Sequence, residues 1–486
     1  MAKEPKKREI KTPSFGLAIS TVLILFLLII LGTKGISVIG IPGLNVDLRL
    51  MFFIAWLPAI GVSLYLGHSY KDIEKSAIDT IRSGIQPAII LLVVGGMTSA
   101  WIASGTVPTL IYYGLKIINP KLFLPLVLIL CSITSLFTGT SWGTISTVGL
   151  AMVAIGMGMN MNIGLVIGAV VSGAFFGDKM SPISDTTVMS SALAGVPVMK
   201  HVKHMLWTVV PGYVVTFILF LILGIRNANA AIDYATVNEI TEAMAANFKL
   251  GIVPLIPMLV LFYLLFTGKP SIPSILGAGL IGCLVAVFYQ GQGLGDVLNI
   301  MYKGYAGDTG NATVNTILNR GGFTSMRDFT NVMLGSFGFV GILKGAGILD
   351  ACIKPVCEKV KTPFGATVAC GLVEMVCLAT GSTQSFANVT TGTLVTPIFK
   401  NQRLKPECMS RCMEDFGTQG AVLIPWGVNA LYVAGMYSVA PAVFIPFCFL
   451  NILVPIISLI YGATGFTMTK YAEGEEIPES DYPMAT

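Results

Sequence analysis

The residues best suited to chemistry lie between Ser172 and Thr187, in the sequence Ser-Gly-Ala-Phe-Phe-Gly-Asp-Lys-Met-Ser-Pro-Ile-Ser-Asp-Thr-Thr. Two carboxylates, a lysine and several hydroxyl groups stand there in the middle of a long apolar run. An ionisable group inside a bilayer is costly and marks a functional site by default. Because glycine and proline interrupt a helix, backbone carbonyls and half-helix ends beside them become available to bind ions. The segment therefore predicts a cation-binding, interrupted transmembrane helix.

Asp185 is the leading candidate for the ion-binding group, because it follows Pro182 in the predicted break. A carboxylate in a low-dielectric site has a raised tendency to hold a proton. Na⁺ needs several oxygens, and the neighbouring hydroxyl groups supply them: Ser181, Ser184, Thr186 and Thr187. One group that binds either Na⁺ or H⁺, but not both, is the minimal chemistry of sodium/proton exchange. The alternative is a structural carboxylate that caps the second half-helix.

Asp178 and Lys179 are adjacent in the same segment and leave two alternatives open. They form a charge-neutral set with other groups that holds the break together, or Asp178 is a second carrier of Na⁺ or H⁺. Upstream, Thr140 and Ser141 stand at the polar centre of another apolar stretch, Gly139-Thr-Ser-Trp-Gly-Thr. We expect their hydroxyl groups to line the same site.

The second half of the chain repeats this pattern of polar groups in apolar surroundings. Glu374 lies eleven residues beyond Pro363, about 16 Å along a helix; it carries a proton or forms a buried pair with a lysine. Glu414 and Asp415 open another predicted broken helix, and an interfacial position is the alternative for one of them. Amide and hydroxyl groups nearby suit an organic substrate or complete a cation shell: Thr383, Gln384, Asn388 and Asn429.

The composition decides the protein class. Charged residues make up 11% of the 486 residues and hydrophobic residues 54%, against about 25% charged in soluble domains. Mean hydropathy is +0.78. We predict an all-α polytopic membrane protein whose surroundings are the lipid bilayer. The net charge of +5 does not indicate nucleic-acid binding, because the basic residues lie in short segments between apolar runs.

About 20 apolar residues cross a bilayer, and ten segments of the chain fit that requirement. The expected spans are 14–32, 49–67, 85–104, 163–195, 206–225, 249–267, 272–290, 329–345, 413–437 and 440–464. Of these, 163–195 and 413–437 are the broken helices. Two further stretches, 121–160 and 363–399, have polar, glycine-rich centres and are predicted to be re-entrant hairpins with tips at Gly139–Thr144 and Gly381–Ser385.

Basic segments set the predicted orientation. Groups such as Lys71, Lys75 and Arg82, or Lys400, Arg403, Lys405 and Arg411, all fall on the cytoplasmic side if the N-terminus does. We expect a plasma-membrane protein with both termini in the cytoplasm. The parts are a basic tail (1–13), an N-terminal half (14–225), an outer loop (226–248), a C-terminal half (249–467) and an acidic tail (468–486), which is predicted to be disordered from Glu473 to Asp481. The three histidines, His68, His201 and His204, are expected to be solvated.

The two halves resemble each other. At an offset of 242, Ser83, Gly96, Gly105 and Gly139 meet Ser325, Gly338, Gly347 and Gly381; at 243, Gly177 and Pro182 meet Gly420 and Pro425. The order of span, short connector, hairpin and broken helix also recurs, in opposite directions. Inverted repeats with broken helices are typical of secondary transporters.

The motifs of energy-coupled enzymes are missing from the sequence. It has no Gly-x-x-x-x-Gly-Lys-Ser/Thr phosphate loop and no dinucleotide fingerprint. We therefore expect a transporter, not an enzyme, without a cofactor and driven by an ion gradient.

Gly139-Thr-Ser-Trp-Gly-Thr and the Ser172–Thr187 segment together resemble the NhaC-type sodium/proton antiporter family, and the likeness extends over nearly the whole chain. The resemblance implies two opposed hairpins, two broken helices, alternating access and a homodimer. Carried over by position, the residues of the family motif are Asp178, Ser181, Pro182, Ser184, Asp185, Thr186 and Thr187.

The expected function is exchange of Na⁺ for H⁺ by alternating access, with Asp185 and Asp178 holding the Na⁺. The alternative is Na⁺- or H⁺-coupled antiport of small organic acids, of the malate/lactate type, or of amino acids. No arginine or lysine falls in the sequence at either hairpin tip to receive a small carboxylate, which favours the simple cation exchanger. Na⁺, H⁺ and a small carboxylate are thus the candidate partners.

Overall fold

The computed structural model describes residues 10–32, 35–36, 41–42, 44, 46–117, 119–231, 234–267, 269–357, 360–379, 383–478 and 481–483. This part of the chain is helical apart from one short antiparallel pair, β1 (Gly35–Ile36) with β2 (Ile41–Pro42), and a bridge between Leu404 and Lys470. The first half contains α1 (Phe15–Gly32), α2 (Leu48–Tyr65), α3 (Tyr70–Ala103), α4 (Thr106–Ile117), α5 (Phe123–Thr138), α6 (Ser141–Thr144), α7 (Leu150–Gly158), α8 (Ile163–Met180), α9 (Asp185–Ala194) and α10 (Val198–Ala231).

The rest of the chain is built of shorter helices. These are α11 (Tyr234–Asn247), α12 (Ile256–Phe266), α13 (Ser271–Val285), α14 (Leu294–Lys303), α15 (Ala312–Leu318), α16 (Arg327–Gly345), α17 (Ile348–Cys357), α18 (Pro363–Ala379), α19 (Gln384–Asn401), α20 (Pro406–Phe416), α21 (Val428–Tyr437), α22 (Pro441–Phe444) and α23 (Phe449–Thr464).

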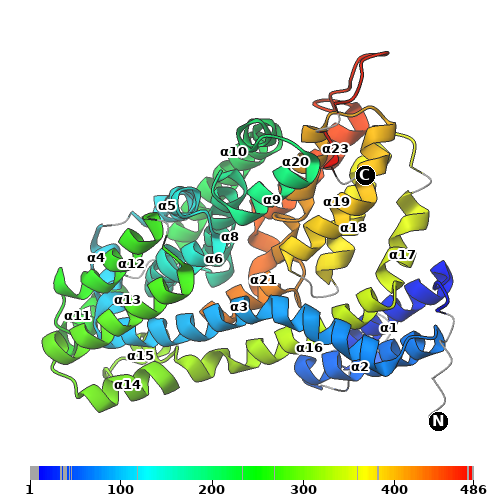
Figure 1. The fold of residues 1–486 in the computed structure, drawn as a ribbon. Helices are drawn as coiled ribbons and strands as arrows, with labels where there is room; N and C mark the ends of the chain where they lie inside the picture. The colour runs from blue at the N-terminus through cyan, green and yellow to red at the C-terminus, as the bar shows by residue number, and fades with distance from the viewer. Residues whose placement is uncertain are drawn as a thin grey trace, which may run out of the picture.

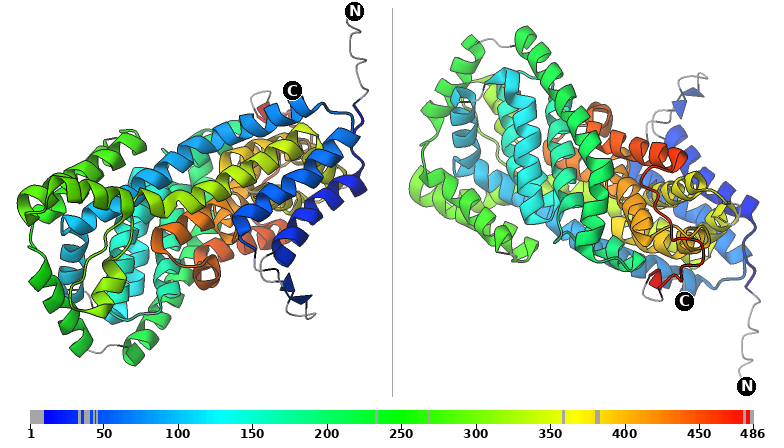
Figure 2. Two further views of the ribbon diagram at one scale, coloured as in Figure 1. Left: turned by 90° about the horizontal axis from the view of Figure 1, so that it is seen from below. Right: turned by 90° about the horizontal axis from the view of Figure 1, so that it is seen from above.

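Helices α3 and α16 lie side by side and run along the length of the molecule (Figures 1 and 2). Their close approach needs glycine at position 341, where a Cβ would come 2.6 Å from the Ala77 Cα. Helices α1, α2 and α17 gather at one end of this pair, and α4 with α11–α15 at the other (Figure 1). The broken helices and both hairpins lie on one side of the pair, between these ends (Figure 1), and α21 packs against α16. The pair thus forms a long support for the elements that carry the chemistry.

Every expected span coincides with a helix or a helix pair. By length and composition, five helices in the described part of the chain are able to cross a membrane, or up to eight if each bent pair counts as one span. The two arms of the first hairpin, Pro120–Thr138 and Ser141–Gly158, are among the five, so length alone does not make this hairpin re-entrant. The chain is a multi-pass, helical membrane protein.

Three segments expected as loops are partly helical. Helix α3 begins at Tyr70, because Ser69 caps it by accepting a hydrogen bond from the Asp72 amide at 3.2 Å. The basic residues Lys71, Lys75 and Arg82 are therefore on a helix and not in a loop. The outer segment 226–248 contains the end of α10 and all of α11. The segment 308–324, whose asparagine and glycine content predicts an exposed outer loop, contains α15.

The expectation of a disordered acidic tail is wrong for its described residues. The Tyr482 side chain is 1% exposed, and its hydroxyl donates to the Leu404 carbonyl at 2.6 Å. The Tyr482 amide donates to the Ala194 carbonyl at the end of α9, 3.2 Å away. The acidic composition of the tail suggests disorder, but its tyrosines provide apolar surface for packing. The tail therefore packs against one end of α9, α19 and α20.

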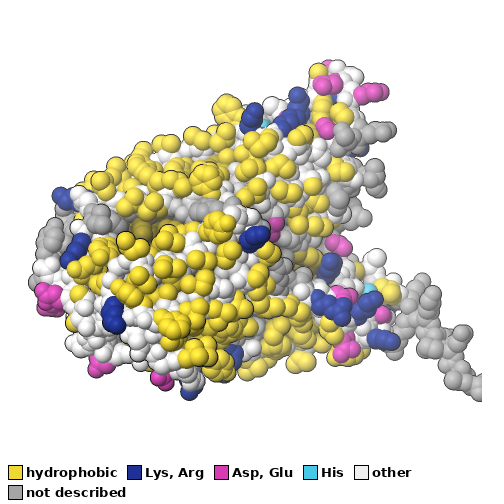
Figure 3. All heavy atoms as spheres, turned by 60° about the vertical axis from the view of Figure 1, so that its left-hand side comes forward, with side chains coloured by type: hydrophobic (Ala, Val, Ile, Leu, Met, Phe, Trp, Pro, Cys, Tyr) yellow, Lys and Arg dark blue, Asp and Glu magenta, His cyan; other side chains and the backbone are white. Residues whose placement is uncertain are grey.

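The outer surface matches a lipid environment. Figure 3 shows a broad hydrophobic face with charged side chains gathered toward its edges. On α10 the exposed side chains are almost all apolar and large: Trp207, Val210, Val214, Ile218, Ile222 and Ile225. Apolar area of this size facing outward is stable only against lipid or another apolar surface.

Candidate functional site

The helix is interrupted where the sequence predicts it, between Met180 at the end of α8 and Asp185 at the start of α9. Thr187 occupies the carbonyls left free by the break, because its hydroxyl donates to Asp178 at 3.2 Å and to Lys179 at 3.0 Å. Gly139 turns the first hairpin with a φ of 68°, and a Cβ there would come 2.9 Å from the Ile183 side chain. The tip of the hairpin therefore packs directly on the break.

Asp178 is the buried carboxylate of this break, with 5% of its surface exposed. Its Oδ2 accepts a hydrogen bond from the Ser141 hydroxyl at 2.6 Å and from the Ser141 amide at 3.2 Å. Its Oδ1 accepts from the Ser184 hydroxyl at 2.7 Å. The hairpin tip and the break thus meet at one carboxylate, which accepts three hydrogen bonds from them.

Asp185, the leading candidate from the sequence, is exposed at the first position of α9. The helix dipole stabilises a carboxylate at the start of a helix whether its side chain faces inward or outward. The spacing in the sequence therefore does not show which of the two carboxylates, Asp178 or Asp185, is buried. The structure brings together Asp178, Ser141 and Ser184, and leaves Asp185 at the edge of that group. Thr186 shares the Ser184 hydroxyl at 3.1 Å.

Lys179 pairs with Asp415 of α20, not with Asp178. The Lys179 ammonium lies 2.8 Å from Asp415 Oδ1, and both side chains are fully buried. The Thr208 hydroxyl of α10 donates to the same oxygen at 2.8 Å. Of the alternatives for Asp178 and Lys179, the shared set does not form: Lys179 pairs with Asp415, and Asp178 accepts hydrogen bonds from Ser141 and Ser184. The Lys179–Asp415 pair joins the two broken helices beside their breaks.

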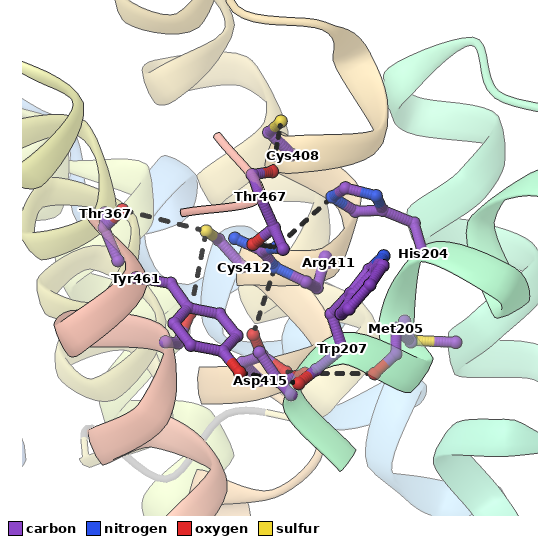
Figure 4. A network of polar contacts seen from close by, with 12 residues as sticks. His204, Met205, Trp207, Thr367, Cys408, Arg411, Cys412, Asp415, Tyr461 and Thr467 are labelled. Atoms are coloured by element: carbon purple, nitrogen blue, oxygen red, sulfur yellow. Dashed lines mark hydrogen bonds and ion pairs between the residues drawn. The ribbon is translucent and has the colours of Figure 1, made fainter. Parts of the chain in front are cut away.

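Arg411 extends this network toward the end of α20. Its Nε lies 3.6 Å from Asp415 Oδ2, and its side chain is fully buried. The guanidinium also contacts His204 Nε2 at 3.2 Å and donates to the Thr467 hydroxyl at 2.6 Å, and Figure 4 shows it between these groups. The expected place of Arg411 in a cytoplasmic loop is therefore wrong; its spacing of four from Asp415 was the signal for a shared helix face.

The expectation of solvated histidines is wrong for His201. Its side chain is fully buried, and its Nδ1 is 2.8 Å from the Ser410 hydroxyl. The burial of His201 could not be predicted from the sequence, because its partner hydroxyl comes from a segment more than 200 residues away.

Glu414 is also fully buried, so neither Glu414 nor Asp415 is interfacial. Its carboxylate accepts hydrogen bonds from Ser190 of α9 at 2.8 Å and from Thr418 at 2.6 Å. The Asn388 amide of α19 donates to the same Ser190 hydroxyl at 3.0 Å. The second hairpin is thereby connected to the first broken helix.

Glu374 is fully buried in α18 without a hydrogen bond from the described residues to either carboxylate oxygen. The alternative of a buried pair with a lysine is wrong for the described part of the chain. The oxygens Asn388 Oδ1 and Thr391 Oγ1, also buried, are likewise left without a hydrogen bond there.

The remaining predicted polar residues have structural partners. Thr140 and Thr383 are the N-cap residues of α6 and α19. Gln384 reaches the Gly417 carbonyl at 3.5 Å. Asn429 accepts a hydrogen bond from the Trp142 indole at 2.7 Å. Ser181 is the exception, because it is buried at the end of α8 and its hydroxyl has no hydrogen bond from the described residues. Of the second predicted tip, Gly381 and Ser382 lie outside the described residues.

The contact of Lys344 with the second hairpin was not predicted from the sequence. The ammonium of this exposed α16 residue lies 4.9 Å from the centre of the Phe386 ring, in the first turn of α19. No arginine or lysine stands at either hairpin tip in the sequence, but this contact brings a lysine from α16 beside the first turn of α19. Lys344 and Phe386 border a cavity of about 800 Å³ between α16, α17 and α19.

The buried charges do not balance. Apart from Glu407, which pairs with the exposed Lys200 at 3.1 Å, the buried acidic and basic side chains of the described residues are four carboxylates and two cations. The carboxylates are Asp178, Glu374, Glu414 and Asp415; the cations are Lys179 and Arg411. Two negative charges therefore need protons or bound cations, since buried charges without compensation are strongly unfavourable.

The relatives of this chain are antiporters with different substrates. The malate-2H⁺/Na⁺-lactate antiporter of Bacillus subtilis is 36% identical over 87% of this chain and 90% of its own length. The Na⁺/H⁺ antiporter NhaC of Alkalihalophilus pseudofirmus is 33% identical over 92% and 96%. The arginine/ornithine antiporter ArcD of Halobacterium salinarum is 29% identical over 99% and 97%. The sequence profile of the Na⁺/H⁺ antiporter family matches residues 2–202 and 173–466, and the chain belongs to this family of membrane antiporters.

Proposed function

We propose that this antiporter exchanges Na⁺ for H⁺ across the plasma membrane, and that Asp178 is the carboxylate that binds the two ions in turn. The observation that carries the proposal is the buried Asp178 carboxylate between Ser141 and Ser184. The adjacent cation, Lys179, is engaged by Asp415 at 2.8 Å. The negative charge of Asp178 therefore remains for a transported cation.

The surroundings of Asp178 suit both ions. Each hydroxyl that donates to the carboxylate keeps lone pairs on its oxygen, so Ser141 and Ser184 also offer ligands to a Na⁺ at Asp178. When Na⁺ leaves, a proton neutralises the same carboxylate in the low-dielectric interior. Asp185, exposed at the start of α9, adds negative charge beside the entrance to this group and attracts cations toward it.

The packing of the halves supports alternating access. The tip of the first hairpin contacts the second broken helix, since Trp142 stacks on Tyr432 of α21 with ring centres 4.4 Å apart. Reciprocally, Asn388 of the second hairpin contacts Ser190 of the first broken helix. This crossed arrangement supports an inverted repeat with two re-entrant hairpins. The distribution of basic segments favours both termini in the cytoplasm, and the resemblance to the family favours a homodimer.

Exchange can be measured in proteoliposomes with an acidic interior and an internal pH-sensitive dye. Addition of Na⁺ outside is expected to dissipate the pH gradient with the wild-type protein. Asp178→Asn keeps the shape of the side chain and removes its charge, so exchange should fall to the level of empty liposomes. Asp296→Asn, on the exposed face of α14, is the matched control and should exchange normally. Full activity of the Asp178→Asn protein would refute the assignment.

The second candidate function is antiport of a small carboxylate or amino acid coupled to Na⁺ or H⁺. Lys344 favours it, because this cation stands over Phe386 beside a cavity of about 800 Å³, and a lysine there can attract a carboxylate. Uptake of labelled malate or lactate that depends on Na⁺, and that Lys344→Gln weakens, would select this candidate. Absence of uptake of malate, lactate, arginine and ornithine, together with Na⁺-driven proton movement, would reject it.

A further inference from the structure

A second group of buried oxygens lies in the C-terminal half, in front of Gly417. A Cβ at this position would meet three oxygens from three segments: the Met413 carbonyl at 2.6 Å, Asn388 Oδ1 at 2.8 Å and Glu374 Oε2 at 3.0 Å. The Gly417 backbone has φ −69° and ψ −60°, which any residue adopts. Glycine is therefore needed here for space and not for backbone freedom.

Of these oxygens, the Met413 carbonyl accepts a hydrogen bond from the Gly417 amide at 2.6 Å, whereas the side-chain oxygens are not satisfied by the described residues. Glu374 and Asn388 are fully buried, and both Glu374 oxygens and Asn388 Oδ1 lack a hydrogen bond from these residues. The Thr391 hydroxyl lies beside Glu374 and interacts with it, but the two groups do not have the geometry of a hydrogen bond. Buried polar atoms are nearly always hydrogen-bonded, so several unsatisfied acceptors at one place call for a missing positive partner.

The neighbouring carboxylate does not fill this role. Glu414 lies near Glu374 and repels it, while its own oxygens are held by Ser190 and Thr418. Lys179 and Arg411 are both engaged with Asp415. Of the two unbalanced negative charges in the buried network, one belongs to Asp178 and one therefore belongs to this carboxylate pair.

We propose that the space in front of Gly417 is a second Na⁺ site, with Glu374, the Asn388 amide oxygen, the Thr391 hydroxyl and the Met413 carbonyl as its oxygen ligands. One free carboxylate with neutral oxygens suits a monovalent cation better than Ca²⁺, which takes six to eight oxygens. The site is separate from Asp178 and belongs to the second hairpin and second broken helix. The second site adds to the proposed exchange function. Only its role in transport rests on that function; the binding of Na⁺ does not.

The ligands of this site join elements from distant parts of the chain. Glu374 comes from α18, Asn388 and Thr391 from α19, and Met413 from α20. Asn388 also contacts Ser190 of α9 through its amide nitrogen. A cation bound here therefore pulls the second hairpin onto the second broken helix, which gives Na⁺ a differential affinity for the conformation in which these elements meet.

Equilibrium binding of ²²Na⁺ to the purified full-length protein tests the site without transport. The wild type is expected to bind two Na⁺ per chain. Gly417→Ala puts a methyl group among the oxygens, and Glu374→Gln removes the charge without adding volume; each should bind one. Gly392→Ala is the matched control on α19, because its methyl would make only ordinary contact with Leu193 at 3.4 Å, and it should bind two.

The Asp178→Asn protein separates this proposal from the proposed function. It should keep the Na⁺ that Gly417→Ala loses, and the double variant should bind none. Two Na⁺ bound to both Gly417→Ala and Glu374→Gln would overturn the second site, as would a single wild-type Na⁺ that only Asp178→Asn removes. A wild type that binds two Na⁺ in this pattern, but exchanges no protons in liposomes, would refute the function and keep the site.

Discussion

The two broken helices meet at the centre of the molecule, but their buried carboxylates are stabilised by different kinds of partner. At the first break, one carboxylate, Asp178, is held by hydroxyl and amide donors from the hairpin tip and the break. At the second, three carboxylates lie close together in sequence or space, and their surroundings differ. Asp415 has two cations, Glu414 has two hydroxyls, and Glu374 has no hydrogen bond from the described residues.

This difference indicates a division of labour. A carboxylate with a permanent cation, such as Asp415 with Lys179, has no charge left for a transported ion. Such a pair fixes the geometry between the breaks, whereas carboxylates that only hydroxyl groups or unpaired oxygens surround remain available to Na⁺ and H⁺. Similar element order in the two halves therefore does not imply equal roles for their acidic residues.

The largest effect is expected from breaking the pair between the halves. Lys179→Gln leaves Asp415 with Arg411 alone, at 3.6 Å, and Asp415→Asn leaves Lys179 buried without its partner. Removal of one member of a buried ion pair costs about 3–5 kcal/mol of stability, so both proteins should unfold at a clearly lower temperature in detergent.

The double variant Lys179→Met with Asp415→Leu controls for the loss of charge itself. Replacing both members with apolar groups of similar volume is often close to neutral. The double variant should therefore recover most of the thermal stability that the single variants lose. Equal stability of Lys179→Gln and the wild type would contradict the view that this pair holds the two breaks together.

A smaller effect is expected from removing single hydroxyl groups at each break. Ser184→Ala takes one of three donors from Asp178 and also one Na⁺ ligand. Hydrogen bonds to charged groups contribute about 1.5–3 kcal/mol, so the Na⁺ concentration for half-maximal exchange should rise roughly tenfold to a hundredfold. Ser190→Ala should change the half-maximal Na⁺ concentration less, because Thr418 still donates to Glu414 at 2.6 Å. The reverse order would place the transported Na⁺ at the second break.

The sequence predicted the class of protein and the two helix breaks, because these depend on local composition. Glycine, proline and polar residues at 177–187 interrupt any apolar helix, so the break between α8 and α9 follows from sequence alone. The orientation of side chains did not follow. Asp178 and Asp185 are seven residues apart across an irregular segment, and a choice between them needs the position of Ser141, 37 residues upstream.

Contacts between distant segments were the other unpredictable part. The partner of Lys179 is 236 residues away, and Lys344 reaches Phe386 only because α16 lies beside the second hairpin. Gly417 carried no signal in the sequence either, since a glycine that makes room for oxygens looks the same as one in a turn. Buried networks of this kind become visible only when the helices are placed together.

Asp185→Asn gives the smallest expected change and the sharpest check on the comparison, because this exposed carboxylate was the leading candidate from the sequence. If Asp185 only attracts cations, its loss should raise the half-maximal Na⁺ concentration by about threefold or less at low ionic strength. The change should disappear near 0.15 M salt, where charges are screened beyond about 8 Å. The maximal exchange rate should stay that of the wild type, since Asp178 still binds the ion. A loss of exchange that added choline chloride does not alter would mean that Asp185 turns inward during transport and shares the ion with Asp178.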